Sequence, residues 1–317
     1  MYKSLITSCT IAIVLFMNTP AHSQELIPYN GAVAGASEKV VSKLDLTFCQ
    51  TSTLTASPDG AHIACVVVDG SRKCLVLDGN RARYYNDILN RSISFSPDGA
   101  HVAYVANEGG RDFVVVDGVE GPRYDRVPVD SLIFSAQGGH LAYSASFGGK
   151  WVAVVDGRQG KLYDDVDGRS IIFSPDGAHI AYAAKSGAKS YAVTDGREGD
   201  MCDGIKPCSM RFSPDGKRLA YAAMIGLQWR VVVDGRGDRL YDDVLDCSVT
   251  FSPDGAHVAY AAKVGARSFV VVDGREGRPY DRIVPTENGR VSFTPDGTLR
   301  YIAREAGYVY LVEQAAR

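Results

Sequence analysis

Histidine residues recur in this chain of 317 residues at a spacing that raises the question of a metal site. Five of the six histidines lie 39 residues, or a multiple of 39, apart: His62, His101, His140, His179 and His257. A zinc ion requires several ligand atoms at about 2.1 Å, and equivalent positions of a repeating architecture lie too far apart to share one ion. We therefore predict that these histidines are polar residues at the start of a strand, and we expect no metal and no other cofactor.

A repeated turn motif positions these residues. Ser-Pro-Asp-Gly or a close variant begins at seven places, with five intervals of 39 residues and a last interval of 42: Ser57, Ser96, Ser135, Ser174, Ser213, Ser252 and Thr294. In the unit that starts at Ser92, the residue pattern predicts four short strands over residues 92–95, 101–106, 113–116 and 124–127. A period near 40 with four strands per unit is typical of a propeller blade. We therefore predict an all-β protein, a seven-bladed β-propeller of four-stranded antiparallel blades.

The beginning of the chain and its composition predict export. Residues 1–23 combine a basic start, an apolar centre and small residues at Ala21 and Ser23, a pattern typical of a secretory signal peptide. The remaining chain has no apolar run of the ~20 residues that a membrane span needs. A net charge of −3 argues against a nucleic-acid partner. We expect a soluble, monomeric protein that is periplasmic or secreted.

The last unit of the repeat ends before its outer strand. Counting back by whole periods from residues 241–244 reaches residues 46–49, ahead of the first turn motif. We predict that this N-terminal segment supplies the missing strand and closes the last blade, which would protect a sheet edge. Residues 24–39 then form a flexible lead-in, and residues 40–317 form the propeller.

The repeat resembles that of a known family. Residues 174–182, Ser-Pro-Asp-Gly-Ala-His-Ile-Ala-Tyr, are similar to the WD40-like PD40 repeat of TolB-type propellers, and seven such units cover nearly all of the mature chain. The resemblance implies a propeller with a protein-interaction role, because TolB-type propellers work in complexes of the cell envelope. Fold identity alone does not settle function.

Catalytic residues are not evident where a propeller enzyme usually carries them, on the innermost strands. Residues 131–134, 170–173 and 248–251 contain no carboxylate and no histidine, and Arg211 is the one charge on the equivalent strands. No nucleophile elbow, phosphate-binding loop or zinc-protease motif occurs. We therefore predict a protein that is not an enzyme. The alternative is an enzyme of the propeller lactonase or lyase kind that acts at the channel mouth.

Two hairpin turns differ from their equivalents in being apolar and aromatic. They carry the following candidate partner-binding residues: Phe147, Trp151, Ile225, Leu227 and Trp229, with Met224 beside them. Aromatic enrichment on an exposed face indicates a site for a protein or peptide partner, although tryptophans packed against neighbouring blades would give the same pattern. Recognition of cell-wall glycan is a further alternative. Charged residues that precede the inner strands are candidate ligands at the channel mouth: Arg91, Asp130, Arg169, Asp246 and Arg290.

The cysteines are candidates for disulfides, since an exported chain permits them. Six remain after removal of the signal peptide: Cys49, Cys65, Cys74, Cys202, Cys208 and Cys247. A hairpin centred on Asp69-Gly70 would place Cys65 opposite Cys74, and we predict a disulfide there. A second disulfide is predicted between Cys202 and Cys208. Cys208 and Cys247 compete as a pair because they lie at equivalent places in adjacent units. The pairing of Cys49 stays open.

Overall fold

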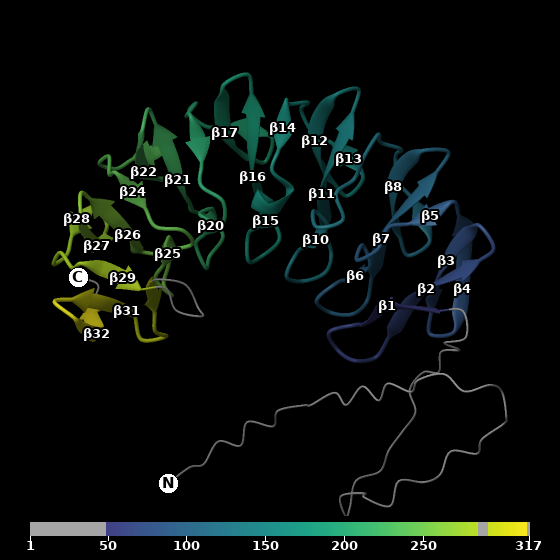
Figure 1. Ribbon diagram of the computed structural model, residues 1–317, viewed down its shortest axis with the longest axis horizontal. Helices are drawn as coiled ribbons and strands as arrows, with labels where there is room; N and C mark the ends of the chain where they lie inside the picture. Colours follow the sequence, from purple (N-terminus) through teal and green to yellow (C-terminus); the bar gives the residue numbers. More distant parts are fainter. Residues whose placement is uncertain (1–48, 285–290, 316–317) are drawn as a thin grey trace, which may run out of the picture. The chain divides into compact units, whose positions relative to one another are not determined.

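The computed structural model describes residues 49–284 and 291–315. In these two ranges the chain forms strands joined by turns, with one short 3-10 turn, η2 (Gly168–Ser170). The strands assemble into seven antiparallel sheets that follow one another in chain order (Figure 1). No helix among the described residues is long and apolar enough to cross a membrane. The predicted signal peptide and lead-in, residues 46–48 of the predicted closing strand, and Arg290 lie outside the described residues.

The seven sheets are the blades of a β-propeller, numbered here along the chain. Blade one contains β1 (Cys49–Ala56), β2 (Ile63–Asp69), β3 (Arg72–Leu77) and β4 (Asn80–Tyr85). Blade two contains β5 (Asp87–Ile88), β6 (Ser94–Phe95), β7 (Val102–Glu108), β8 (Arg111–Val116) and β9 (Val119–Glu120). Blade three contains β10 (Ile133–Phe134), β11 (Leu141–Phe147), β12 (Lys150–Val155) and β13 (Arg158–Gln159). Blade four contains β14 (Asp165–Val166), β15 (Ile172–Phe173), β16 (Ile180–Ser186), β17 (Lys189–Thr194) and β18 (Arg197–Glu198). Blade five contains β19 (Gly204–Ile205), β20 (Arg211–Phe212), β21 (Leu219–Ile225), β22 (Gln228–Val233) and β23 (Arg236–Gly237). Blade six contains β24 (Asp243–Val244), β25 (Thr250–Phe251), β26 (Val258–Val264), β27 (Arg267–Val272) and β28 (Arg275–Glu276). Blade seven contains β29 (Arg282–Val284), β30 (Val291–Phe293), β31 (Thr298–Glu305) and β32 (Tyr308–Ala315).

A long hairpin between the second and third strands forms the centre of each blade. In blade two, β7 pairs with β8 from Ala103–Val116 to Glu108–Arg111. Its turn consists of Gly109 and Gly110, both at positive φ, where glycine carries no Cβ penalty. Along these strands the stretches 102–106 and 113–115 are apolar and buried, since neighbouring blades cover both faces of the sheet.

The first strand of a blade is interrupted, which differs from the continuous strand predicted over residues 92–95. In blade two it consists of β5 and β6, which pair with opposite ends of β7, at Asn107–Ala106 and at Ala103–Val102. Buried Ser92 occupies the interruption. Its hydroxyl donates to the Leu89 carbonyl (2.7 Å) and accepts from the Val105 N–H (3.1 Å). The serine therefore supplies the hydrogen bond that a strand residue would have made. Its counterparts also donate to the carbonyl three residues earlier: Thr53, Ser131, Ser170, Ser209 and Ser248.

The segment between two blades is hydrogen-bonded to both of them. The predicted fourth strand, residues 124–127, is in fact such a crossing, and the outer strand of blade two is the shorter β9. In the next crossing, Tyr163 pairs with Trp151 of blade three, while Asp165 pairs with Lys185 of blade four. Tyr163 exchanges two backbone hydrogen bonds of 2.8 Å with Trp151. A residue pattern alone predicts a strand here, but it does not show which sheet the strand joins.

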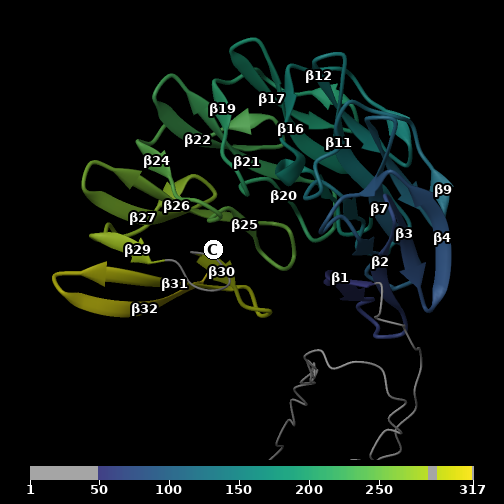
Figure 2. The same ribbon diagram turned by 45° about the vertical axis from the view of Figure 1, so that its right-hand side comes forward.

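Successive blades lie face to face (Figure 2). Buried apolar clusters fill the space between them. Between blades two and three, Val105 and Val114 meet Val154, and Tyr124 packs edge-on against Tyr143 with ring centroids 6.2 Å apart. Comparable clusters join every successive pair from blades one and two to blades six and seven. Burial of these side chains from water is the main stabilising contribution to the fold.

The repeated histidines lie in the turns at the start of the second strands, where each one pairs with an aspartate. His62 Nδ1 lies 2.6 Å from Asp78 Oδ2, and Asp78 Oδ1 accepts the Ile63 N–H at 2.9 Å. The other repeat histidines pair with the corresponding aspartates, and in blade five Arg218 pairs with Asp234 at 2.9 Å. Each histidine thus connects the start of the second strand to the hairpin that ends the third.

The closure of the last blade stays a prediction, because residues 46–48 lie outside the described residues. Cys49, the last residue of that predicted segment, begins β1 and pairs with Val67 in blade one. In blade seven, both β29 and β30 pair with β31, and β32 pairs with β31 on its other side. Exposed apolar residues line β32, with Val309 at 68% and Leu311 at 70% exposure.

Candidate functional site

The hairpin of blade five presents the most exposed apolar side chain among the candidate residues. β21 and β22 pair up to Ile225–Gln228, so Gly226 and Leu227 form the turn. Leu227 is 92% exposed, while Ile225 and Met224 are half-buried. Gly226 adopts a φ of 63°, a left-handed conformation that favours glycine and holds the turn tight. The hairpin therefore projects a leucine into solvent at the tip of a tight two-residue turn.

Trp229 is more buried than the sequence predicts for a contact residue. Its indole is half-buried and packs against the apolar cluster between blades five and six. Lys206 Nζ lies 4.8 Å from the ring centroid, a cation–π contact. The same ammonium contacts Asp243 Oδ1 (2.6 Å), the Val244 carbonyl (2.7 Å) and Asp246 (3.1 Å). Lys206 therefore connects blades five and six and fixes the tryptophan behind the turn.

The candidate residues of blade three form a separate group. Phe147 pairs with Lys150 at the end of its hairpin and is 50% exposed, with Arg111 of blade two over its ring at 5.9 Å. Trp151 is half-buried and packs against the cluster between blades three and four. The hairpin of blade four, which pairs Ser186 with Lys189, comes between this group and the one in blade five. The five predicted residues therefore lie at one end of the blades but not in one cluster.

Three exposed apolar residues at a single repeat position were not among the sequence candidates. They are Leu162 at 49%, Met201 at 62% and Leu240 at 37% exposure. They lie 39 residues apart, in blades three, four and five, where blades two and six have Arg123 and Pro279. Comparison of equivalent positions along the repeat would have identified them.

The candidate residues at the channel mouth do not form one cluster. Asp130 and Arg169 lie at the same repeat position of blades three and four, and they pair with each other at 2.9 Å. Asp246 contacts Lys206 instead. Arg91 is exposed and adopts a positive φ of 62° in the interruption of the first strand. The two ion pairs, Asp130–Arg169 and Lys206–Asp246, each join neighbouring blades, so their first role is to stabilise the contact between those blades.

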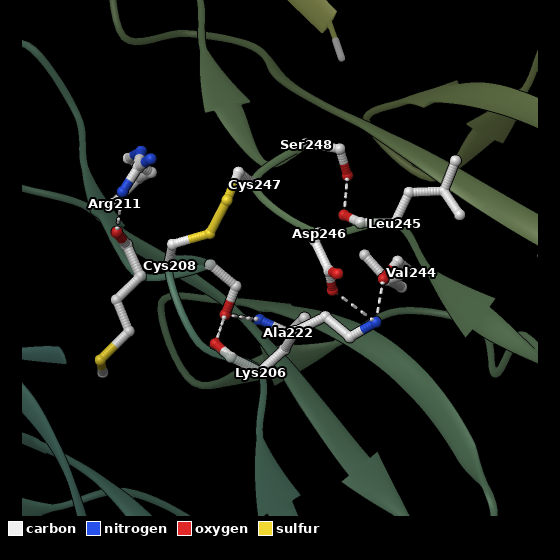
Figure 3. Close-up of a disulfide and its surroundings, with 11 residues drawn as sticks. Lys206, Cys208, Arg211, Ala222, Val244, Leu245, Asp246, Cys247 and Ser248 are labelled. Atoms are coloured by element: carbon white, nitrogen blue, oxygen red, sulfur yellow. Dashed lines mark hydrogen bonds and ion pairs between the residues drawn. A yellow bond between two sulfur atoms is a disulfide. The ribbon is translucent and has the colours of Figure 1, made fainter. Parts of the chain in front are cut away.

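A disulfide occupies the corresponding position of blades five and six. Cys208 and Cys247 are joined, with Cα atoms 5.2 Å apart, close to Lys206 and Asp246 (Figure 3). The predicted disulfide between Cys202 and Cys208 is therefore wrong, and the competing pair is the one that forms. Cys202 is a buried free thiol whose Sγ donates to the Ser190 carbonyl. The same repeat position thus joins neighbouring blades by an ion pair in one place and by a covalent bond in another.

The predicted disulfide between Cys65 and Cys74 is not formed, because the predicted register is wrong. The hairpin turn consists of Gly70 and Ser71, one residue later than expected, so Cys65 pairs with Val76 and Cys74 pairs with Val67. Both thiols are free and lie with Cys49 on the face of blade one that points away from blade two. Burial raises the pKa of Cys65 to about 12, which makes its thiolate rare at neutral pH.

No group of three or more His, Cys, Asp or Glu side chains that could hold a metal ion occurs within residues 49–284 and 291–315.

Arg211, on β20, is exposed and donates to the Met210 carbonyl at 2.9 Å. Loss of hydration around the guanidinium lowers the pKa of Arg211, although an arginine stays charged at neutral pH.

Comparison with known proteins shows similarity of fold. No family model matches the sequence, and no curated protein matches it. Among solved structures, TolB from Acinetobacter baumannii is 19% identical over 70% of this chain, which spans only 61% of the TolB chain, with a TM-score of 0.35. The β-propeller domain of the Trilobed protease from Pyrococcus furiosus is 16% identical over 86% of this chain and 97% of that one, with a TM-score of 0.34. The β-propeller domain of Myceliophteria thermophila Cps50 is 15% identical over 82% and 95% of the two chains, with a TM-score of 0.36. At these identities the likeness concerns the fold alone.

Proposed function

We propose that this protein is an exported, non-enzymatic propeller scaffold that binds a protein or peptide partner of the cell envelope. The observation that carries the proposal is the 92% exposure of Leu227 at the tip of the blade-five hairpin. Equivalent turn positions hold Gly110, Gly149, Ala188 and Ala266. The fold therefore does not need a large side chain at this position, and the exposed leucine is available to a partner that covers it.

The support beneath Leu227 suits a binding surface. Gly226 permits the tight turn, and the Lys206 contacts hold Trp229 against the junction of blades five and six. Anchors that are already ordered lose little conformational entropy when a partner binds. Ile225, half-buried beside the tip, adds apolar area to the same surface. Phe147, with Trp151 behind it, would form a second contact region on blade three for a partner large enough to cross blade four.

The burial of Trp229 changes which variant tests the proposal best. Trp229→Ala would remove packing between blades, so a loss of binding could reflect a loss of stability. Leu227→Ala instead restores the residue type that blades four and six have at this position, and it removes only exposed atoms. We expect it to weaken capture of the partner by about 1–2 kcal/mol, roughly 5- to 30-fold, without changing the melting temperature.

The experiment compares capture from envelope extract by the immobilised mature protein and two variants. The matched control is Val119→Ala, which truncates another apolar side chain, 72% exposed, at the opposite end of the blades. A partner retained by the wild type and by the control but lost by Leu227→Ala supports the proposal. Equal retention by all three proteins contradicts it. Capture of glycan instead of protein would assign the surface to the cell wall.

A further inference from the structure

A cleft of about 470 Å³ lies between blades two and three. The hairpin that follows β8 lines one side, from Asp117 to Pro122, and the turn before β11 lines the other, from Gly138 to His140. These turns lie at the opposite end of the blades from the Leu227 hairpin, because they adjoin the start of the second strand and the end of the third. The cleft is therefore separate from the surface proposed above, and the two proposals can fail independently.

The walls of the cleft are apolar, and its polar groups are few. Val114, Val116, Phe134, Leu141 and Tyr143 line it. Its volume lies in the range of small-molecule sites, which combine apolar walls with a small number of fixed polar groups.

Two histidine–aspartate pairs supply the fixed polar groups. His101 Nδ1 lies 2.6 Å from Asp117, and His140 Nδ1 lies 2.8 Å from Asp156. Because each Nδ1 faces a carboxylate, the other edge of each imidazole is the edge that can contact a ligand. Glu120 also lines the cleft, with its carboxylate held by Arg83 at 2.8 Å.

The repeat departs from its own pattern at three positions that line this one cleft. Val119 stands where blades three to six have Arg158, Arg197, Arg236 and Arg275. Pro122 stands where they have Lys161, Asp200, Arg239 and Arg278. Gly139 stands where blades two, four, five and six have Ala100, Ala178, Lys217 and Ala256. The first two positions belong to blade two and the third to blade three, so changes in separate segments converge on the same cleft.

These departures remove positive charge from the cleft and open it. Four other clefts between successive blades of the described chain each have at least one arginine in their lining: Arg275, Arg158, Arg197, and Arg218 with Arg236. The cleft between blades two and three has neither arginine nor lysine, although it keeps the carboxylates of Asp117 and Asp156. The histidine–aspartate pairs recur in other blades, so the loss of the arginine is the difference that changes the charge.

We propose that this cleft binds a small amphipathic cation, an aromatic or aliphatic group that carries an ammonium. The apolar body lies against Val114, Val119 and Leu141, and the ammonium lies toward Asp117 and Asp156. An anion would face these carboxylates with no lysine or arginine in the lining to balance them, which disfavours it. Loss of the arginine costs the fold little, since its counterparts Arg158, Arg197, Arg236 and Arg275 are exposed on the short outer strands of their blades.

The test uses the full mature protein and three indole compounds that differ in charge. Tryptamine carries an ammonium, indole is neutral, and indole-3-acetate carries a carboxylate on the same ring. We expect saturable binding of tryptamine below ~1 mM by calorimetry, weaker binding of indole, and none of indole-3-acetate. Absence of saturable tryptamine binding, or tighter binding of indole-3-acetate, overturns the proposal.

Two variants that restore the pattern of the repeat locate the site. Val119→Arg returns the charge that the other clefts have, and we expect at least a 10-fold loss of tryptamine affinity with an unchanged melting temperature. Gly139→Ala adds a methyl group into open space, since no heavy atom lies within 4 Å of its Cβ position, and we expect a smaller loss. Arg158→Val in the next cleft is the converse control and should leave binding at the first cleft unchanged. Full tryptamine binding by Val119→Arg would refute the assignment to this cleft.

Discussion

The disulfide between Cys208 and Cys247 should make a large contribution to the stability of the propeller, and its removal can be given a magnitude. The bond connects residues 39 positions apart, and both cysteines are exposed. In the chain-entropy description, a cross-link over a loop of this length lowers the entropy of the unfolded chain by about 13 cal/mol/K, or about 4 kcal/mol at 25 °C. Cys208→Ser/Cys247→Ser removes the cross-link and little packing, so we expect a loss close to that value.

Urea unfolding with and without a reducing agent measures the effect. The oxidised wild type should show the highest midpoint, and reduction should lower it to that of the double variant. Reduction should leave the double variant unchanged. Cys202→Ser provides the matched control, because Cys202 is a free thiol and its removal should preserve the full response to reduction. Equal midpoints for the oxidised wild type and the double variant would refute the entropic reasoning, and a Cys202→Ser protein insensitive to reduction would show a different pairing.

Two further predictions concern the polar groups that hold each blade together. Ser209→Ala removes the hydroxyl that bridges the Lys206 carbonyl (2.7 Å) and the Ala222 N–H (3.1 Å), and it should lower the free energy of unfolding by about 1–3 kcal/mol. The control Ser190→Ala should lower it little. Equal losses of stability for the two variants in urea unfolding would contradict the role of Ser209. The hydrogen bond to Asp78 raises the pKa of His62, so its stabilising contribution is full below the unfolded pKa near 6.5 and is lost as the pH rises through the folded pKa. The stability of the wild type relative to His62→Gln should therefore be greater near pH 5.5 than near pH 8.5, and an NMR titration midpoint for His62 below 6.5 would contradict the assignment.

The repeat period predicted the number of blades and the central hairpin of each. Residues 101–106 and 113–116 correspond closely to β7 (Val102–Glu108) and β8 (Arg111–Val116), because long apolar stretches with β-branched residues follow the buried faces of a sheet. The first and fourth strands were less predictable. A buried serine interrupts the first strand, and the crossing segment divides its hydrogen bonds between two sheets, neither of which a residue pattern reveals.

The disulfide predicted from the register of a single hairpin was wrong. A shift of one residue in the turn after Asp69 changed the partner of Cys65 from Cys74 to Val76. The correct pair, Cys208 and Cys247, was indicated instead by the equivalence of the two positions in the repeat. Among the surface candidates, Leu227 is exposed as predicted, but Trp229 is half-buried because the junction of blades five and six takes up its indole. The cleft at Val119 could have been found in the sequence by asking where several departures from the repeat converge.

The crossing segments determine how the blades share their stability. Tyr163 is bonded to Trp151 of blade three, and the next residue, Asp164, donates its N–H to the Lys185 carbonyl of blade four. Adjacent residues of the crossing segment are therefore bonded to different blades, and the sheet of blade four begins directly after the last bond to blade three. In a linear array of repeats, such nearest-neighbour coupling determines cooperativity. Melting of blade three would release Tyr163, and with it one end of the segment whose next residue is bonded to blade four, so we expect neighbouring blades to unfold together rather than as separate 39-residue units.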